Sequence, residues 1–201
     1  MNETIPAPWI KELARLKRRK TQLASQDNLI VFYGSSSIRL WVKMQEDLAP
    51  FNTLNLGFGG SSFKWCLYFF DELFEGLSPS RIVLYAGEND LTDNNVAEVK
   101  AYYDQLLTKI QATYPSAQLS QISLKPSPTR EDILPELREL NTYFQQTMAR
   151  LNGVYINIHE DMLTQKGATR PELFLSDGLH MNREGYKIWA INTLAHLQAA
   201  N

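Results

Sequence analysis

The sequence contains a single cysteine, Cys66, among its 201 residues. One cysteine cannot form an intramolecular disulfide, and it cannot supply the paired thiols of a structural zinc site or a CxxC redox motif. Long apolar runs are also missing near the start, where charged residues interrupt the first twenty positions, so neither a signal peptide nor a transmembrane helix is predicted there. We therefore expect a cytoplasmic protein, and contact with a membrane is not expected.

A large excess of one charge is absent as well, since 20 basic and 22 acidic residues give a net charge of −2. Six of the basic residues and only two of the acidic ones lie in the first twenty positions, so the remainder is mildly acidic. A mildly acidic body lacks the basic surface that nucleic acid binding requires, and no nucleic acid partner is expected. The length and the ordinary share of hydrophobic residues predict a globular protein with a sizeable core.

The basic N-terminal segment, residues 1–27, is predicted to form an amphipathic helix. Trp9, Leu13, Leu16 and Leu23 recur at helical spacing and would share one face. This helix is expected to pack on the domain formed by residues 28–201, or to extend from it; docking to anionic lipid is the alternative. No chemistry is assigned to the segment.

Beyond residue 25, short β-rich apolar runs alternate with helical stretches. Strands are predicted at 29–33, 53–56, 82–85, 119–124 and 154–156, and helices at 37–49, 61–77, 95–113, 131–151 and 183–198. Right-handed crossovers between parallel strands place helices on both faces of a sheet. The pattern therefore predicts a three-layer α/β/α domain with a five-stranded parallel sheet.

The loops at the carboxyl ends of parallel strands hold the ligand in such domains, so candidate residues are sought there. Ser35, Ser36 and Ser37 follow Gly34 at the end of the first predicted strand. Each of the three serines is a candidate nucleophile, because the N-terminus of the next helix offers unpaired backbone N–H groups that can stabilise an oxyanion. Plain capping of the helix is the alternative interpretation.

Two further loops offer candidate oxyanion donors. The Gly57–Gly60 segment lacks the third glycine of a dinucleotide fingerprint and follows the second strand, so a nicotinamide or flavin cofactor is not expected. The backbone N–H of Gly60 and the side-chain amide of Asn89 are instead candidate donors. Simple turns at these positions are the alternative, and Asp90 is expected to form hydrogen bonds within its own loop.

The fourth loop contains Asp177 and His180, three residues apart. On one turn of chain the carboxylate can orient the imidazole, whose second nitrogen is then free to accept a proton from a serine. His159 and His196 have no comparable setting. Together the four loops supply every part that acyl transfer requires.

In order along the chain, Gly34-Ser35-Ser36, Gly60, Gly87-Glu88-Asn89-Asp90 and Asp177-Gly178-Leu179-His180 resemble the four sequence blocks of the SGNH hydrolases, the GDSL-type esterases and lipases. The resemblance implies a flavodoxin-like sheet and a serine esterase that uses no metal or organic cofactor. It also implies roles for individual residues. Ser36 would be the nucleophile, His180 the general base and Asp177 its orienting carboxylate, with an oxyanion hole formed by the backbone amides of Ser36 and Gly60 and the side chain of Asn89.

Ser35 departs from the family pattern, which usually has Asp immediately before the nucleophile. The substrate is expected to be a small-molecule ester with a short acyl group, as for a carbohydrate deacetylase, a lysophospholipase or a thioesterase. The alternatives are a catalytically silent ligand-binding protein of the same fold and a phosphate-binding protein, although no Walker lysine is present. Aromatic residues of the second predicted helix and its approach are expected in the core, with an acyl pocket or a homodimer interface as the alternatives.

Overall fold

A computed structural model describes residues 7–23 and 26–199 of the chain. Five parallel strands form one sheet in the order β2-β1-β3-β4-β5. They are β1 (Ile30–Gly34), β2 (Thr53–Gly57), β3 (Arg81–Tyr85), β4 (Gln118–Ile122) and β5 (Val154–Ile156). This is the strand order of the flavodoxin-like fold, in which the topology reverses between β1 and β3 and opens a ligand site there.

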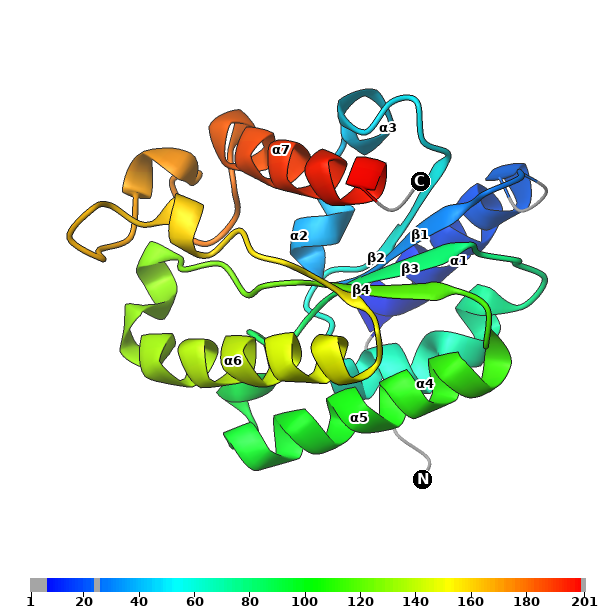
Figure 1. Cartoon of the computed structure of the whole chain (residues 1–201), viewed down its shortest axis with the longest axis horizontal. Helices are drawn as coiled ribbons and strands as arrows, with labels where there is room; N and C mark the ends of the chain where they lie inside the picture. Colours follow the sequence, from blue (N-terminus) through cyan, green and yellow to red (C-terminus); the bar gives the residue numbers. More distant parts are fainter. Residues whose placement is uncertain (1–6, 24–25, 200–201) are drawn as a thin grey trace.

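Helices cover both faces of the sheet. They are α1 (Ala7–Leu23), α2 (Ser36–Arg39), α3 (Met44–Asp47), α4 (Phe63–Phe74), α5 (Val96–Thr113), α6 (Leu134–Arg150) and α7 (Arg183–Ala199). Figure 1 shows α4, α5 and α6 on one face and α2, α3 and α7 on the other, which confirms the predicted three-layer architecture. Within the described ranges, no helix combines the length and apolar character needed to cross a bilayer.

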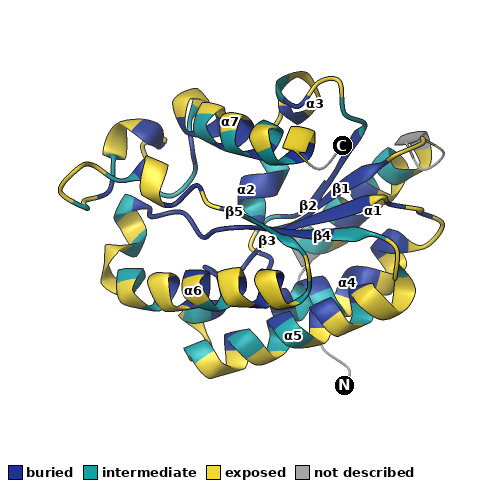
Figure 2. Cartoon of the chain, viewed as in Figure 1, coloured by how far each residue is buried: buried dark blue, intermediate teal, exposed yellow. Residues whose placement is uncertain are grey.

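The first three strands are buried on both faces, as is usual for a parallel sheet that helices cover on both sides. Every residue of β1, β2 and β3 is buried (Figure 2). Turn and capping residues set the helix ends: Asn95 and Glu98 form a capping box at the start of α5, and Asn182 accepts hydrogen bonds from the first turn of α7. These caps explain why the starts predicted for the two helices, at 95 and 183, lie within one residue of the observed ones.

The single helix predicted at 37–49 is wrong, because the chain forms two short helices, α2 and α3, separated by residues 40–43. The break lets the ring of Trp41 turn into the core, where it lies 5.8 Å from the rings of Phe32, Tyr186 and Trp189. Its indole N–H also donates to Asp47 at 2.8 Å. Burying this large ring stabilises the fold more than continuing the helix would. The next residue, Val42, is exposed and adds nothing to the core.

The aromatic residues around α4 divide into two groups. Phe58, Phe63, Phe69, Phe70 and Phe74 are buried in the core, as the packing interpretation expects. Trp65 is partly buried and Tyr68 is exposed. Most of these aromatic side chains therefore belong to the hydrophobic core.

Helix α1 packs beside β2 and α4. Leu13 and Leu16 of its apolar stripe are buried and Trp9 is partly buried, whereas the side chain of Leu23 lies outside the described part. On the basic face, the Lys20 ammonium donates to backbone carbonyls near the C-terminal end of α4, where the helix dipole favours a cation.

Candidate active site

The candidate nucleophile Ser36 is the first residue of α2, directly after β1. The turn requires glycine at position 34, because Gly34 has φ +148 and a Cβ there would collide with the backbone carbonyl of Tyr85 in the neighbouring strand. Ser35 is buried, and its backbone N–H donates to that same carbonyl at 2.9 Å, while its side chain forms no capping hydrogen bond. Ser36 is consequently held at the carboxyl edge of the sheet.

The loop before α7 brings His180 to Ser36. The Nε2 atom of His180 lies 3.1 Å from the Ser36 hydroxyl oxygen, and its Nδ1 atom lies 2.7 Å from Oδ2 of Asp177. When Nδ1 carries the proton and donates to the carboxylate, Nε2 is left as the acceptor for the serine hydroxyl. The three side chains therefore form one hydrogen-bonded line from carboxylate to imidazole to hydroxyl.

Asp177 is held in place by its own loop. Its Oδ1 atom accepts hydrogen bonds from the backbone N–H groups of Leu179 and His180, both at 2.9 Å. Hydrogen bonds from the His180 side chain and from these backbone groups lower the pKa of Asp177 to about 2. The carboxylate is therefore ionised at neutral pH and rigidly aimed at the imidazole.

The candidate oxyanion donors come from three loops that are tied to one another. Ser61 Oγ donates to the carbonyl of Gly34 at 2.8 Å, which joins the second loop to the first. Asn89 Nδ2 donates to the carbonyl of Ser61 at 3.0 Å, which joins the third loop to the second. The backbone N–H groups of Ser36 and Gly60 donate to no acceptor among the described residues. A donor without an internal partner is available to a ligand.

Asp90 accepts backbone hydrogen bonds within its own loop, as expected, and it also reaches a second element. Asp90 is buried, and its carboxylate accepts two contacts from the backbone N–H of Phe63, at 2.9 and 3.1 Å, at the N-terminus of α4. Burial raises its pKa to about 7, against the opposing effect of those hydrogen bonds. Asp90 thus links the loop that carries Asn89 to the helix that follows Gly60, because a helix N-terminus attracts a carboxylate.

A buried ion pair anchors the loop that carries Asn89, and the sequence does not predict it. The Lys125 ammonium lies 2.6 Å and 2.9 Å from the two carboxylate oxygens of Glu88, and the Tyr85 hydroxyl also donates to this carboxylate. The Lys125 side chain is only 1% exposed and that of Glu88 is 7% exposed. Nothing in the local pattern around position 125 signals this pairing, because the partners are 37 residues apart.

A polar hollow of about 550 Å³ opens beside the candidate oxyanion donors. It is lined by Gly60, Ser62, Lys64, Trp65, Asn89, Thr92, Asp93, Asn94 and Arg130. Two of the three candidate donors thus border a space able to hold part of a small substrate, next to one partly buried indole ring.

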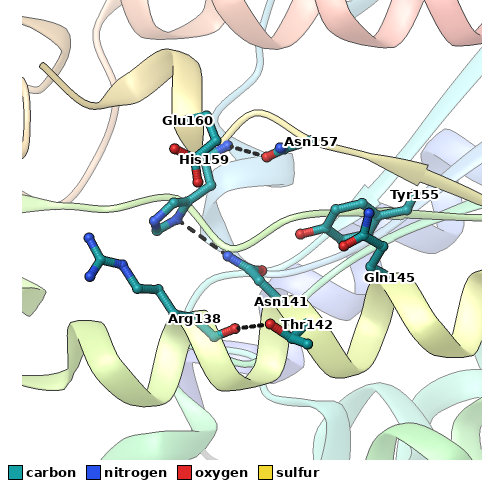
Figure 3. Close-up of a pocket in the computed structure, with 8 residues that line it drawn as sticks. All are labelled: Arg138, Asn141, Thr142, Gln145, Tyr155, Asn157, His159 and Glu160. Atoms are coloured by element: carbon teal, nitrogen blue, oxygen red, sulfur yellow. Dashed lines mark hydrogen bonds between the residues drawn. The ribbon is translucent and has the colours of Figure 1, made fainter. Parts of the chain in front are cut away.

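His159 lies elsewhere, at the end of β5, in a separate pocket of about 150 Å³ (Figure 3). Its Nδ1 atom is 2.8 Å from the carbonyl of Leu124 and 3.3 Å from Nδ2 of Asn141, and burial lowers its pKa. His196 bonds the carbonyl of Asn192 within α7. Neither histidine joins the Ser36 site. Within residues 7–23 and 26–199, no group of three or more His, Cys, Asp or Glu is arranged to hold a metal ion.

Comparison with known proteins shows the family of the chain. The sequence profile of the GDSL-like lipase/acylhydrolase family matches residues 27–188. A search of curated protein sequences gives no match. The fold and the family match together define an ester-hydrolysing serine hydrolase.

Solved structures share the fold. A putative platelet activating factor from Streptococcus pneumonia superposes with a TM-score of 0.78 and 21% identity, covering 94% of this chain and 95% of that one. A GDSL-like lipase from Bacteroides thetaiotaomicron superposes with a TM-score of 0.75 and 22% identity, covering 94% of this chain and 100% of that one. A psychrotrophic esterase from Pseudoalteromonas sp. superposes with a TM-score of 0.65 and 18% identity, covering 87% of this chain and 100% of that one. The chain belongs to the GDSL-like lipase/acylhydrolase family, as its four sequence blocks predict.

Proposed function

We propose that the protein is a serine esterase that hydrolyses small, short-acyl carboxylic esters through an acyl-enzyme formed on Ser36. The observation that carries the proposal is the line of hydrogen bonds from Asp177 through His180 to the Ser36 hydroxyl, at 2.7 and 3.1 Å. Hydrogen-bond distances of this size are those at which a general base removes a proton from a nucleophile.

In the proposed reaction the Ser36 oxygen attacks the ester carbonyl while His180 Nε2 accepts the hydroxyl proton. The carbonyl oxygen becomes an oxyanion, which the N–H groups of Ser36, Gly60 and Asn89 stabilise. Collapse of the tetrahedral intermediate breaks the bond to the alcohol, which leaves with the proton from His180. Water then attacks the acyl-enzyme by the same steps and releases the acid and free Ser36.

Asp177 supplies a fixed negative charge throughout this cycle. Because its pKa is about 2, it stays ionised when His180 becomes an imidazolium, and the attraction between the two charges stabilises that state. The backbone N–H groups on Oδ1 prevent the carboxylate from rotating away. The Ser35 hydroxyl takes part in none of these steps. The presence of Ser35 where the family usually has Asp therefore leaves the proposed reaction unchanged.

The polar hollow supports a hydrophilic substrate. It touches Gly60 and Asn89, and hydroxyl, amide and charged side chains line it around a single indole. Such a lining suits a sugar or another polyol better than a long alkyl chain. We therefore place a small acyl ester of a hydrophilic alcohol, as in a carbohydrate deacetylase, ahead of a lysophospholipid or an acyl thioester.

Labelling by a fluorophosphonate tests the nucleophile. Stoichiometric modification of the peptide that contains Ser36, abolished in Ser36→Ala and retained in the matched variant Ser37→Ala, is the expected result. Ser37 is the neighbouring buried serine, so it controls for the effect of losing a hydroxyl in α2. Labelling that persists in Ser36→Ala overturns the assignment, and no labelling of the wild type favours a silent binding protein.

A panel of substrates tests the acyl and alcohol parts separately. Among nitrophenyl esters, kcat/KM is expected to be highest for acetate and to fall with each longer acyl chain. Among acetyl esters, acetylated sugars are expected to be hydrolysed faster than simple alkyl acetates. A maximum at long acyl chains, or hydrolysis confined to lysophospholipids, contradicts the proposal.

A further inference from the structure

Helix α1 reaches the loop that carries the candidate oxyanion donor Gly60. The indole N–H of Trp9 donates to the carbonyl oxygen of Gly59 at 2.6 Å. One helical turn later, a carboxylate oxygen of Glu12 accepts from the backbone N–H of Gly59 at 3.1 Å. Both polar backbone groups of Gly59 are therefore held from a helix some fifty residues earlier in the chain.

The Gly59 carbonyl and the Gly60 N–H belong to the same peptide group. In a planar trans peptide these two groups point in opposite directions, so a hydrogen bond that fixes the oxygen also fixes the direction of the N–H. Accepting a hydrogen bond at the oxygen further polarises the peptide and strengthens its N–H as a donor. The hydrogen bond from Trp9 to the Gly59 oxygen therefore helps to fix the direction of the Gly60 N–H, which would face the substrate oxyanion.

The Gly57–Gly60 segment needs such support from outside. Glycine residues have wide conformational freedom, and Gly60 has φ +68, a region that other residues rarely adopt. A loop of this composition does not by itself maintain one orientation of a backbone N–H. The nearest atom to the position that a Cβ of Gly60 would occupy belongs to the Trp9 ring, at 3.9 Å.

Neighbouring groups hold the two α1 side chains in turn. The Trp9 ring packs against Phe58, Trp65 and Phe69, with centroid distances of 5.7, 4.7 and 6.2 Å. The second oxygen of Glu12 pairs with Arg39 at 3.4 Å. Because Arg39 lies on α2, three residues after Ser36, Glu12 connects the Gly59 loop to the helix that begins at the candidate nucleophile.

We propose that Trp9 and Glu12 are positioning residues of the esterase, and that they orient the Gly59–Gly60 peptide so that the Gly60 N–H stabilises the oxyanion. The inference rests on the proposed function of the Ser36 site and assigns a catalytic contribution to a helix for which the sequence predicts no chemistry. An oriented donor lowers the barrier because it requires no reorganisation when charge develops.

Trp9→Phe tests the proposal, since phenylalanine keeps an aromatic ring at this position but lacks the N–H donor and one ring of the indole. The expected result is a roughly 10-fold lower kcat for a short-chain nitrophenyl ester with little change in KM, because only the transition state is affected. Binding of an arylboronic acid, whose tetrahedral boronate oxygen imitates the oxyanion, should weaken by a similar factor. A role limited to stability would change neither quantity in folded protein.

Two further comparisons keep the test decisive. Trp189→Phe is the matched control, because this buried indole N–H has no hydrogen-bond partner among the described residues and its loss should leave kcat and boronate affinity unchanged. At the other contact, Glu12→Ala should lower kcat, whereas Glu12→Gln keeps an oxygen acceptor for Gly59 and should recover most of it.

The outcomes separate this inference from the proposed function. If Ser36 is labelled by fluorophosphonate and Trp9→Phe and Glu12→Ala retain wild-type kcat and boronate affinity, the positioning role is refuted while the esterase assignment stands. If Ser36→Ala retains full activity, the esterase assignment itself fails. Parallel losses of kcat and boronate affinity in both α1 variants support the positioning role.

Discussion

The hydroxyl oxygen of Ser36 and the Nε2 atom of His180 lie 3.1 Å apart, although 144 residues separate them in the sequence. Ser36 follows the central strand β1, and His180 lies in the loop that enters α7. Residues at the carboxyl ends of parallel strands gather at one edge of the sheet, so distant segments meet there. The chemistry proposed for the protein depends on this meeting.

Asp177→Asn is expected to lower kcat roughly 10³-fold or more, in line with other Ser-His-Asp triads. An asparagine amide would donate to His180 Nδ1, so the proton would move to Nε2, which could then no longer accept one from Ser36. Steady-state kinetics on a nitrophenyl ester measures the loss. Asp161→Asn is the control, because Asp161 is exposed and accepts a hydrogen bond from Asn192 away from the site; this variant should keep the wild-type kcat.

The same pair gives an expectation for pH. Because the pKa of Asp177 is about 2, the carboxylate stays ionised from about pH 4 upward, and its protonation does not cause the loss of activity in mild acid. The Asp177→Asn deficit should therefore be complete at about pH 8 and unchanged at about pH 9, because the wild-type carboxylate is fully ionised at both values. A deficit that appears only above about pH 8 would contradict this assignment.

Asn89→Ala is expected to cost about 3 kcal/mol of transition-state stabilisation, equivalent to roughly a 10²-fold loss of kcat. Asn89→Asp should be worse than Asn89→Ala, since a carboxylate of the same shape places negative charge where the oxyanion forms. Full activity in Asn89→Ala would overturn the donor role. Circular dichroism must show native folding in both variants, because Asn89 also donates to the carbonyl of Ser61.

Lys125→Met is expected to destabilise the protein by about 3–5 kcal/mol, because it leaves the buried Glu88 carboxylate without its cation. The double variant Lys125→Met with Glu88→Gln should be less destabilised than Lys125→Met alone, since the remaining group is then neutral and can still bond Tyr85. Urea unfolding measures each free energy. The single variant Glu88→Gln completes the comparison. If the double variant loses as much unfolding free energy as the two single variants together, the two groups do not interact.

Asp90 should make stability depend on pH. Its pKa is raised from 3.8 to about 7 in the folded protein, so the unfolded chain releases this proton at lower pH than the folded one. The contribution of Asp90 to the free energy of unfolding therefore falls as pH rises from about 4 to about 7, and levels off above that. Urea unfolding of wild type and Asp90→Asn across this window should show the wild type losing stability relative to the variant. A relative gain would contradict the prediction.

Much of the architecture was predictable because local patterns encode it. Continuous apolar runs mark strands buried on both faces, and alternation with helices dictates a parallel sheet with helices on both sides. The short blocks around Ser36, Asn89 and His180 could be placed at one edge of that sheet for the same reason. The segment 37–49 is an exception to this agreement, since burial of Trp41 interrupts the single helix that local propensity favours.

The layers, the strands and the loops that carry the candidate catalytic residues follow from the order of the amino acids, because hydrophobic period and turn chemistry are properties of neighbouring residues. The pairing of Glu88 with Lys125, the contact of Asp90 with the start of α4 and the bond from Trp9 to Gly59 follow from the packing of the folded chain. Each of these contacts joins side chains or backbone groups far apart in the chain. Which of them meet depends on how whole elements pack, and no spacing along the sequence specifies that.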